Sequence, residues 1–288
     1  MLNVLVTGSS GQVGSELKVL SFNYSYNFFF TNKEALDISN LLSINDFIEI
    51  NSIDIIINCA AYTAVDMADK EMELADKINN KAVHYLAKIA KERAIKLVHI
   101  STDYIFDGKN FRPYVESDKP NPINIYGKTK RNGEKAMQEI NPCNSIIIRT
   151  SWVYSSFGTN FVKNMLRLGK ERDSLGVIFD QIGTPTYARD LAKVILDILP
   201  QIENKKLEIY NYSNEGVLSW YDFAKEIMKM AKIECKINPI ETKEYPSPVK
   251  RPYYSLLNKE KIKNKFNIQI PFWKDSLDTC LKVMGERR

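Results

Sequence analysis

The feature that most constrains the fold is an alternation of short apolar runs with amphipathic segments over about the first 150 residues. The apolar runs are continuous, as expected of strands buried on both faces of a parallel sheet. They lie at 2–6, 26–31, 53–58, 96–101 and 144–149. Segments with helical spacing lie between them, at 12–20, 43–50, 70–93 and from about 126 onward. This order predicts an α/β protein with a Rossmann-type, doubly wound parallel sheet.

The pattern loosens beyond Trp152, which suggests a second structural unit. Further helices are expected at 160–169, 188–199, 219–231 and 271–284, and short strands at 177–179, 208–212 and 236–240. We therefore expect an NAD(P)-binding Rossmann domain over 1–151 and mainly a smaller C-terminal α/β substrate lobe over 152–288. The helices at 160–170 and 188–199 are expected to return to the first domain. No flexible linker separates the two parts.

Composition and charge exclude several classes of protein. The 288 residues carry 40 basic and 35 acidic side chains, a net charge of +5. This balance argues against a nucleic-acid partner but suits an anionic small molecule. The first residues enter an apolar run without the basic region of a signal peptide. No apolar run approaches the roughly 18 to 20 residues that span a bilayer. A cytoplasmic protein without a membrane partner is the expectation.

Cysteine and histidine usage predicts no metal centre. The four cysteines are far apart and form no CxxC motif, and the chain has only two histidines. No zinc site is therefore expected, and the thiols are expected to be reduced.

Three glycines follow the first apolar run with GxxGxxG spacing: Gly8, Gly11 and Gly14. Glycines allow the backbone to turn tightly and to approach a pyrophosphate closely, and the following helix offers its N-terminal N–H groups. Gln12 and Val13 lie within the turn and share its expected role. The strand–turn–helix context predicts binding of a dinucleotide, NADPH or NADH.

Later strand ends are expected to complete the cofactor site. The second strand ends at Thr31 and is followed by Asn32 and Lys33, without the acid that typically selects NAD. This absence favours NADP, while NAD stays open. Two further groups are expected at the cofactor. Asp37 and Ile38 are expected near the adenine, and Ala60, Ala61 and Tyr62 near the nicotinamide.

A hydroxyl, a phenol and an ammonium suggest hydride transfer to or from a carbonyl. Thr102 ends the fourth predicted strand, and Tyr126 and Lys130 share one helix face at i,i+4 spacing. A tyrosine with its ordinary pKa near 10 is a poor proton donor or acceptor at neutral pH. We expect the Lys130 ammonium and an oxidised nicotinamide to lower the pKa of Tyr126. Tyr126 would then protonate the oxygen of a ketone, with Lys130 also holding the cofactor ribose and Thr102 bonding the carbonyl oxygen.

These motifs resemble the extended short-chain dehydrogenases, and within them the dTDP-4-dehydrorhamnose reductase family. The matching stretches are GQVGSEL at 11–17, NCAAYTAVD at 58–66, STDYIFDG at 101–108, YGK at 126–128, RTSWVY at 149–154 and RP at 251–252. The resemblance implies NAD(P)H-dependent reduction of the C4 ketone of dTDP-4-dehydro-L-rhamnose, a step of dTDP-rhamnose and polysaccharide biosynthesis. It implies that Tyr126 is the acid, that Asp103 and Trp152 contact the sugar, and that Arg251 meets the nucleotide diphosphate.

Other functions remain open at this stage. Similar 4,6-dehydratases carry an Asp-Glu pair after the threonine, whereas this chain has Asp103-Tyr104, which favours reduction. An epimerase or dehydrogenase for another nucleotide sugar is the main alternative. A non-catalytic protein resembling the regulatory subunit of methionine adenosyltransferase is another. Some members of the family are dimers bridged by Mg²⁺ through glutamates. Glu16 matches one such position and Asp190 lies near a second, but the ligand set is incomplete, so a homodimer is possible and no metal is predicted.

Overall fold

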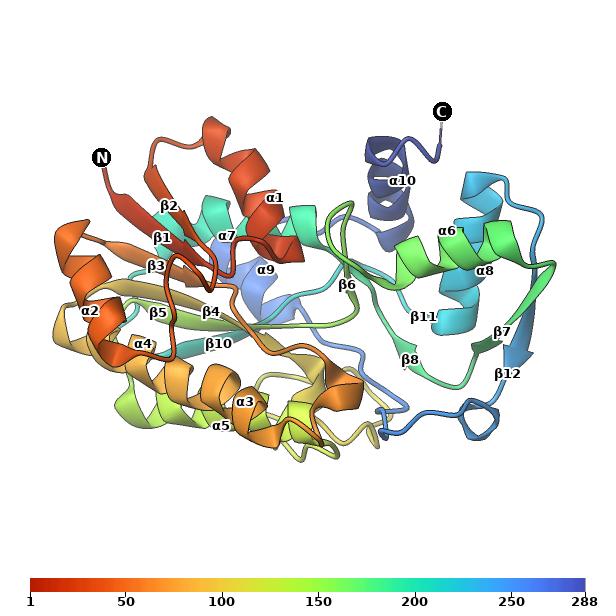
Figure 1. Ribbon diagram of the computed structural model, residues 1–288, viewed down its shortest axis with the longest axis horizontal. Coiled ribbons are helices and arrows are strands. Elements are labelled where there is room, and N and C mark those ends of the chain that lie inside the picture. Colours follow the sequence, from red (N-terminus) through yellow and green to blue (C-terminus); the bar gives the residue numbers. More distant parts are fainter. Residues whose placement is uncertain (288) are drawn as a thin grey trace.

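The computed structural model describes residues 1–287 and is built around one six-stranded sheet (Figure 1). All neighbouring strands pair in parallel, in the order β10-β5-β4-β3-β1-β2. The strands are β1 (Asn3–Thr7), β2 (Asn27–Thr31), β3 (Ile55–Asn58), β4 (Lys96–Thr102), β5 (Ser145–Thr150) and β10 (Glu208–Asn211). The Rossmann-type, doubly wound sheet predicted from the sequence is confirmed. Its order reverses between β1 and β3, where ligands of such sheets bind.

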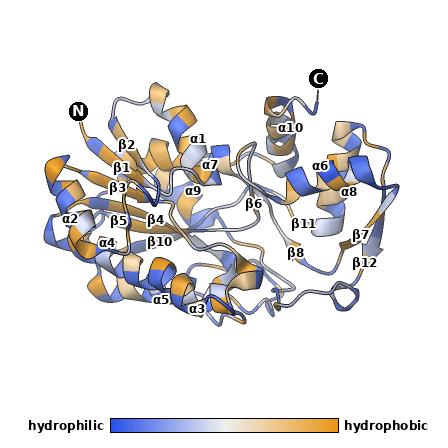
Figure 2. Ribbon diagram, viewed as in Figure 1, coloured by the Kyte–Doolittle hydropathy of each residue, from blue (hydrophilic) through white to orange (hydrophobic). Residues whose placement is uncertain are grey.

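Two helical layers cover the sheet because successive strand residues point to opposite faces. Val4 and Val6 pack with α1 (Gln12–Leu20), α7 (Ala188–Ile198) and α9 (Glu260–Phe266). Leu5 between them points to the other face and packs with α2 (Leu41–Ile50), α4 (Ala82–Glu92) and α5 (Ile125–Ile140). All three strand residues are fully buried. The strands are accordingly apolar along their length, and the helices are apolar on one side (Figure 2).

A second, smaller core lies beside the carboxyl ends of the strands. It gathers α6 (Phe161–Glu171), α8 (Trp220–Ala231) and α10 (Trp273–Val283) with β7 (Ser174–Ile178) and β12 (Lys236–Ile240), which pair in parallel. Two further two-stranded pairings complete this part: β6 (Val153–Tyr154) pairs with β9 (Thr186–Tyr187), and β8 (Ile182–Gly183) pairs with β11 (Leu218–Ser219).

The chain crosses between the two cores more than once. Of the two helices expected to return to the first domain, α7 does so and packs along α1. The expectation for 160–170 differs from the structure, since α6 packs against α8 in the smaller core. Its buried side chains, Val162, Met165 and Leu166, meet that core rather than the sheet. Strand β10 and helix α9, both from the C-terminal half, belong to the sheet layer. The proposed boundary near residue 151 stays a prediction.

Most elements lie where the periodicity places them, with one notable irregularity. The helix expected over 70–93 begins as α3 (Met72–Asp76), continues as a π-helical segment over Lys77–Lys81, and runs on as α4. The π segment brings the buried Asn79 amide to the loop after β3, where its Oδ1 accepts from the Tyr62 N–H at 2.9 Å and its Nδ2 donates to the Tyr62 carbonyl at 3.0 Å. Helix α9 and the two-residue strands were not predicted, because elements this short do not show a hydrophobic period in the sequence.

A buried ion pair fixes helix α5 to the sheet. The Arg149 guanidinium on β5 donates to both oxygens of Glu134 on α5, at 2.9 Å each, and both side chains are almost fully buried. Arg149 also donates to the Glu116 carbonyl at 3.1 Å and lies over the Phe106 ring. Burial alone would raise the pKa of Glu134, but the charge and hydrogen bonds of Arg149 outweigh it and lower that pKa.

We predict that Arg149→Met lowers the free energy of unfolding by about 3–5 kcal/mol, because it leaves the buried Glu134 carboxylate with only its 3.2 Å contact to Arg131. Arg167→Met is the matched control, since the Arg167–Glu171 pair is exposed and should be worth less than about 1 kcal/mol. Urea unfolding of both variants measures the difference. Equal losses for the two variants would contradict the role given to the buried pair.

Candidate active site

The glycine turn lies at the point where the strand order reverses. Gly8 has a φ of +65°, and a Cβ built there would lie 2.6 Å from the Ala60 backbone. A Cβ at Gly14 would lie 2.5 Å from the Gly8 carbonyl oxygen. The Gly11 N–H closes the turn by donating to that same oxygen at 3.0 Å. Side chains are therefore excluded at Gly8 and Gly14, and the turn consists of closely packed backbone that leads into the first N–H groups of α1, as a pyrophosphate site requires.

The other predicted cofactor residues line the same edge of the sheet. Thr31 ends β2, and its carbonyl accepts from the Ser9 N–H of the turn at 3.0 Å. Asp37 accepts from the Ser39 hydroxyl at 2.6 Å, which lowers its pKa, and Ile38 is buried. Lys33 is exposed. Ala60 begins the loop after β3, directly beside Gly8.

Thr102, Tyr126 and Lys130 are brought together where β4 meets α5. Asn124 caps α5 by accepting from the Gly127 N–H at 2.8 Å, so the helix begins directly before the phenol. Gly127 then allows the helix to approach the chain after β4, since a Cβ there would lie 2.1 Å from the Tyr104 carbonyl oxygen. Thr102 is buried, and its hydroxyl is one of the groups that influence the pKa of the partly exposed Tyr126 phenol. Lys130, one turn further, is almost fully buried.

The pKa of Tyr126 differs from the prediction. Burial raises it to about 12, and the hydrogen bond with Thr102 lowers it only in part. Lys130 is not among the groups that lower it, because its ammonium points away and donates to the Ile100 carbonyl at 2.7 Å. Tyr126 is therefore a neutral phenol at pH 7, the form that can donate a proton. Burial lowers the pKa of Lys130 to about 8.

The carboxyl group of Asp103 is buried, and one of its oxygens has no hydrogen-bond partner among residues 1–287. It is 2% exposed; its Oδ1 accepts from the Thr102 hydroxyl at 2.9 Å, and its Oδ2 is buried without a partner among residues 1–287. Burial raises its pKa to about 7, although the hydroxyl of Thr102 opposes the shift. A buried carboxyl oxygen without a partner, next to Thr102, suits a polar ligand such as a sugar hydroxyl.

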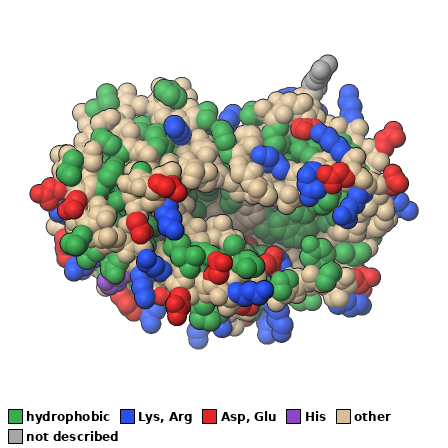
Figure 3. Space-filling model, viewed as in Figure 1, with side chains coloured by type: hydrophobic (Ala, Val, Ile, Leu, Met, Phe, Trp, Pro, Cys, Tyr) green, Lys and Arg blue, Asp and Glu red, His purple; other side chains and the backbone are tan. Residues whose placement is uncertain are grey.

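The two remaining predicted substrate residues lie at the junction of the two parts. The Trp152 backbone is left-handed, with a φ of 48°, and its ring stacks on Trp220 with ring centres 3.6 Å apart. Arg251 lies in the loop after β12, and its guanidinium pairs with Asp66 at 2.6 Å and with Ser247. The space-filling view shows a hollow between the parts, with hydrophobic side chains inside it (Figure 3). A cleft of about 1610 Å³ includes Arg251, Asp66 and Trp220 in its lining, but none of Thr102, Tyr126, Lys130 or Trp152.

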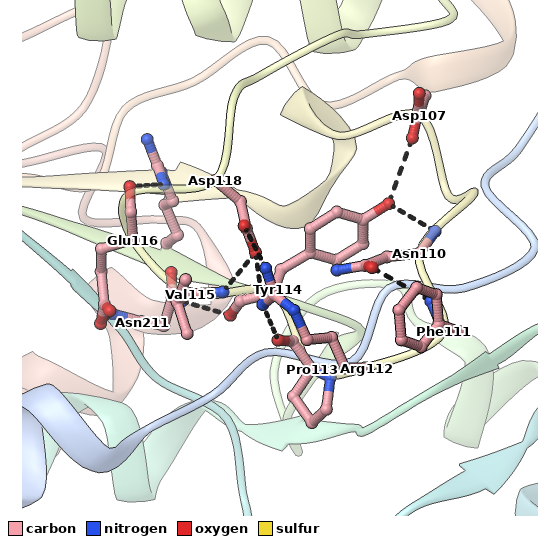
Figure 4. A network of polar contacts seen from close by, with 11 residues as sticks. Asp107, Asn110, Phe111, Arg112, Pro113, Tyr114, Val115, Glu116, Asp118 and Asn211 are labelled. Carbon is pink, nitrogen blue, oxygen red and sulfur yellow. Dashed lines mark hydrogen bonds and ion pairs between the residues drawn. The ribbon is translucent and has the colours of Figure 1, made fainter.

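The loop between β4 and α5 is ordered by its own polar contacts (Figure 4). The Tyr114 hydroxyl donates to Asp107 at 3.2 Å, and the Val115 N–H donates to Asp118 at 2.8 Å. The Asn211 amide on β10 donates to the Tyr114 carbonyl at 2.9 Å. These contacts hold in place the loop that connects Thr102, at the end of β4, to Tyr126, at the start of α5.

Glu16 and Asp190, considered above for a bridging metal, are engaged inside the chain. Glu16 is fully buried, pairs with Arg189 at 2.8 Å and accepts from Ser155 at 2.6 Å. Asp190 accepts from the Asn214 amide at 2.7 Å and from the Ser276 hydroxyl. Within residues 1–287, no three histidine, cysteine or acidic side chains are grouped as metal ligands. In the same range, no helix has the length and apolar character of a membrane span.

Sequence reasoning missed three polar residues of the site. Asn58 was recognised only as the end of a strand and Asn79 only as part of the helix expected over 70–93. His99 was recognised only as one of the two histidines. Each is about 1% exposed and bonded to residues of the predicted site. A polar side chain within an otherwise apolar strand is the one signal that could have singled out His99.

The sheet, the glycine turn and the Thr102–Tyr126–Lys130 group define the chain as a Rossmann-type α/β protein with a candidate dinucleotide site. A family model described as the RmlD substrate binding domain matches residues 2–285, and the chain belongs to this family.

Individual relatives agree with that assignment. A dTDP-4-dehydrorhamnose reductase of Aggregatibacter actinomycetemcomitans is 41% identical, covering 96% of this chain and 97% of the relative. The crystal structure of a dTDP-4-dehydrorhamnose reductase from Clostridium acetobutylicum superposes with a TM-score of 0.94 at 38% identity, covering 99% and 100% of the two chains. That of the Bacillus anthracis reductase in complex with NADP gives 0.93 at 37% identity, covering 98% and 100%.

The raised pKa of Asp103 predicts a pH-dependent stability. The unfolded chain ionises Asp103 near its ordinary pKa of 3.8 and the folded chain only near 7. The contribution of Asp103 to stability therefore falls as pH rises between these values and is constant above them. Asp103→Asn removes the effect, so its stability relative to the parent should increase from pH 4 to pH 8 by at most roughly 4 kcal/mol. Urea unfolding at the two pH values measures this, and a pH-independent difference would contradict it.

Proposed function

We propose that this chain reduces the C4 ketone of dTDP-4-dehydro-L-rhamnose to dTDP-L-rhamnose with NADPH or NADH. The observation that carries the proposal is that Thr102, at the end of β4, acts on the neutral Tyr126 phenol, within a sheet whose strand β1 leads into the glycine turn. The family and the relatives named above support the same reaction. The product is a precursor of cell-surface polysaccharide.

The residues present fit a dinucleotide. Gly8 and Gly14 let the turn pack without side chains against Ala60 and against its own backbone, and α1 begins directly after Gly11. When bound, the reduced nicotinamide supplies the hydride. Ala60, Ala61 and Tyr62 would flank the nicotinamide side, and Thr31, Asp37 and Ile38 the adenosine side. The exposed Lys33 and the lack of an acid after β2 favour a 2′-phosphate, in line with the NADP bound to the Bacillus anthracis relative.

The proposed roles of the chain's own side chains follow from their protonation. Tyr126 donates its proton to the developing alkoxide at C4, and its phenol is fully protonated at pH 7 because its pKa is about 12. Thr102 holds the same oxygen by a hydrogen bond. Lys130 lies one turn after Tyr126 on α5, and we assign it to the cofactor ribose in addition to the Ile100 carbonyl that its Nζ already contacts. Asp103 offers its free Oδ2 to the sugar.

The outer parts of the substrate are assigned to the cleft. Arg251 lines it and presents a planar fork suited to a diphosphate. It has first to exchange its contact with Asp66 for the ligand, because that ion pair occupies the guanidinium in the free protein. Trp152 is stacked on Trp220, so these two rings together would face the sugar.

The reaction is tested with purified protein, the reduced cofactor and dTDP-4-dehydro-L-rhamnose. Loss of cofactor absorbance that depends on the keto sugar supports the proposal. No loss with either cofactor would exclude it and would favour the non-catalytic alternative. We place the reaction in the cytoplasm, in line with four cysteines that form no disulfide. A homodimer stays a prediction.

We predict that Tyr126→Phe lowers kcat by a factor of about 10²–10⁴, the contribution of a positioned general acid. The affinity for NADPH, measured by fluorescence titration, should change little. Tyr85→Phe, which removes a phenol on α4, is the control and should keep the parent rate. A Tyr126→Phe enzyme with near-parental kcat would remove Tyr126 from its role as acid.

A further inference from the structure

A continuous chain of buried polar side chains runs from the glycine turn to Lys130. The Thr7 hydroxyl donates to Asn58 Oδ1 at 2.7 Å. Asn58 Nδ2 lies 3.0 Å from His99 Nδ1, and His99 Nε2 lies 3.4 Å from Lys130 Nζ. The four side chains come from β1, β3, β4 and α5, and none is more than 2% exposed. Water is thus excluded from the chain of contacts, so the donors and acceptors must match one another.

A backbone group fixes the direction of these hydrogen bonds. The Ala60 N–H donates to Asn58 Oδ1 at 3.2 Å, so this atom is the amide oxygen and Nδ2 faces His99. Because Nδ2 can only donate, His99 Nδ1 must accept. A neutral imidazole has one N–H, which must then lie on Nε2. Burial lowers the pKa of His99 well below its usual range, so the ring is neutral at pH 7.

The Nε2–H of this tautomer points at Lys130. An ammonium has only donors, and its N–H groups would face the Nε2–H. A neutral amine has a lone pair that accepts from Nε2–H while one of its own hydrogens is donated to the Ile100 carbonyl, at 2.7 Å. The hydrogen bonds therefore fit the amine form of Lys130 better than the ammonium form.

Two other ionisable groups influence Lys130. Glu134 lies one turn further along α5, and Cys59 follows β3. The Glu134 carboxylate favours the ammonium, but both its oxygens are engaged by Arg149. Burial raises the pKa of the Cys59 thiol to about 12, so it is neutral at pH 7. His99 is the group that bonds Nζ directly from the sheet side.

We propose that His99 is a positioning residue for Lys130, which holds the lysine at the Ile100 carbonyl and destabilises its ammonium form through a tautomer set by Asn58. This series of hydrogen bonds begins at Thr7, next to Gly8 of the turn, and thus connects the candidate cofactor site to the protonation state of Lys130. Only the effect of His99 on activity rests on the proposed function. The tautomer of His99 and the titration of Lys130 can be measured in the free protein.

Nitrogen NMR of the histidine rings tests the tautomer directly. The chain has two histidines, and His84, which is exposed on α4, serves as an internal reference. His84→Gln assigns the signals. We expect His99 to carry its proton on Nε2 without titrating between about pH 6 and pH 9, and its Nε2 signal to shift as Lys130 titrates. A proton on Nδ1, or titration of His99 near pH 6.5, would overturn the proposal.

Two variants separate this role from general packing. In Lys130→Met the pH-dependent shift of the Nε2 signal should vanish, and its persistence would show that Nε2–H does not face the amine. In His99→Gln the side chain can turn an oxygen toward Lys130, which stabilises the ammonium. The titration of Lys130, followed by NMR of its ¹³Cε signal, should then move upward by about one pH unit or more. An unchanged or lowered pH of titration would contradict the proposal. If the chain proves inactive, the NMR measurements on Lys130→Met still decide it.

Discussion

The candidate site depends on how closely helix α5 packs against its neighbours. Two glycines of α5 make this packing possible, because a Cβ at Gly127 would lie 2.1 Å from the carbonyl oxygen of Tyr104, in the turn after β4, and a Cβ at Gly133 would lie 2.1 Å from that of Asn79, in the π-helical segment. The buried pair of Glu134 with Arg149 then fixes the helix in place. Tyr126 and Lys130 are consequently held by backbone contacts and by an ion pair, and not by their own packing alone.

Burial decides the charge of each group at this junction. The Tyr126 phenol and the Asp103 carboxyl both favour their protonated forms, and the pKa of Lys130 is lowered toward neutrality. A site with few fixed charges suits a reaction in which negative charge appears on a ketone oxygen and is neutralised by a nearby proton donor. The anionic part of the proposed substrate would be bound further out, where Arg251 lines the cleft.

The sheet and most helices were predictable because their signals are periodic or are fixed by local chemistry. Continuous apolar runs mark the strands, and the GxxGxxG turn needs Gly8 for its left-handed backbone. Tyr126 and Lys130 were identified from their spacing on a helix. The convergence of Thr102 with Tyr126 was anticipated from the order of strands and helices, since parallel strands end at one edge.

What could not be predicted depends on contacts between distant segments. The pKa of Tyr126 was expected to be lowered by Lys130, but Lys130 turns to Ile100 and burial dominates. The pairing of Arg251 with Asp66 joins residues 185 positions apart. The roles of Asn58 and His99 depend on the direction of hydrogen bonds that only the folded chain defines. The packing of α6 in the smaller core likewise follows from which side chains surround it.

The most direct test of the central claim, hydride delivery to the C4 ketone, is isotope transfer. The protein is incubated with dTDP-4-dehydro-L-rhamnose and NADPH deuterated at the transferred position, and the product is analysed by mass spectrometry and proton NMR. The account predicts a dTDP-sugar with one deuterium, located at C4, and an equal amount of oxidised cofactor. A product without deuterium, or one altered at another ring carbon with no net oxidation of the cofactor, would contradict it and point to an epimerase.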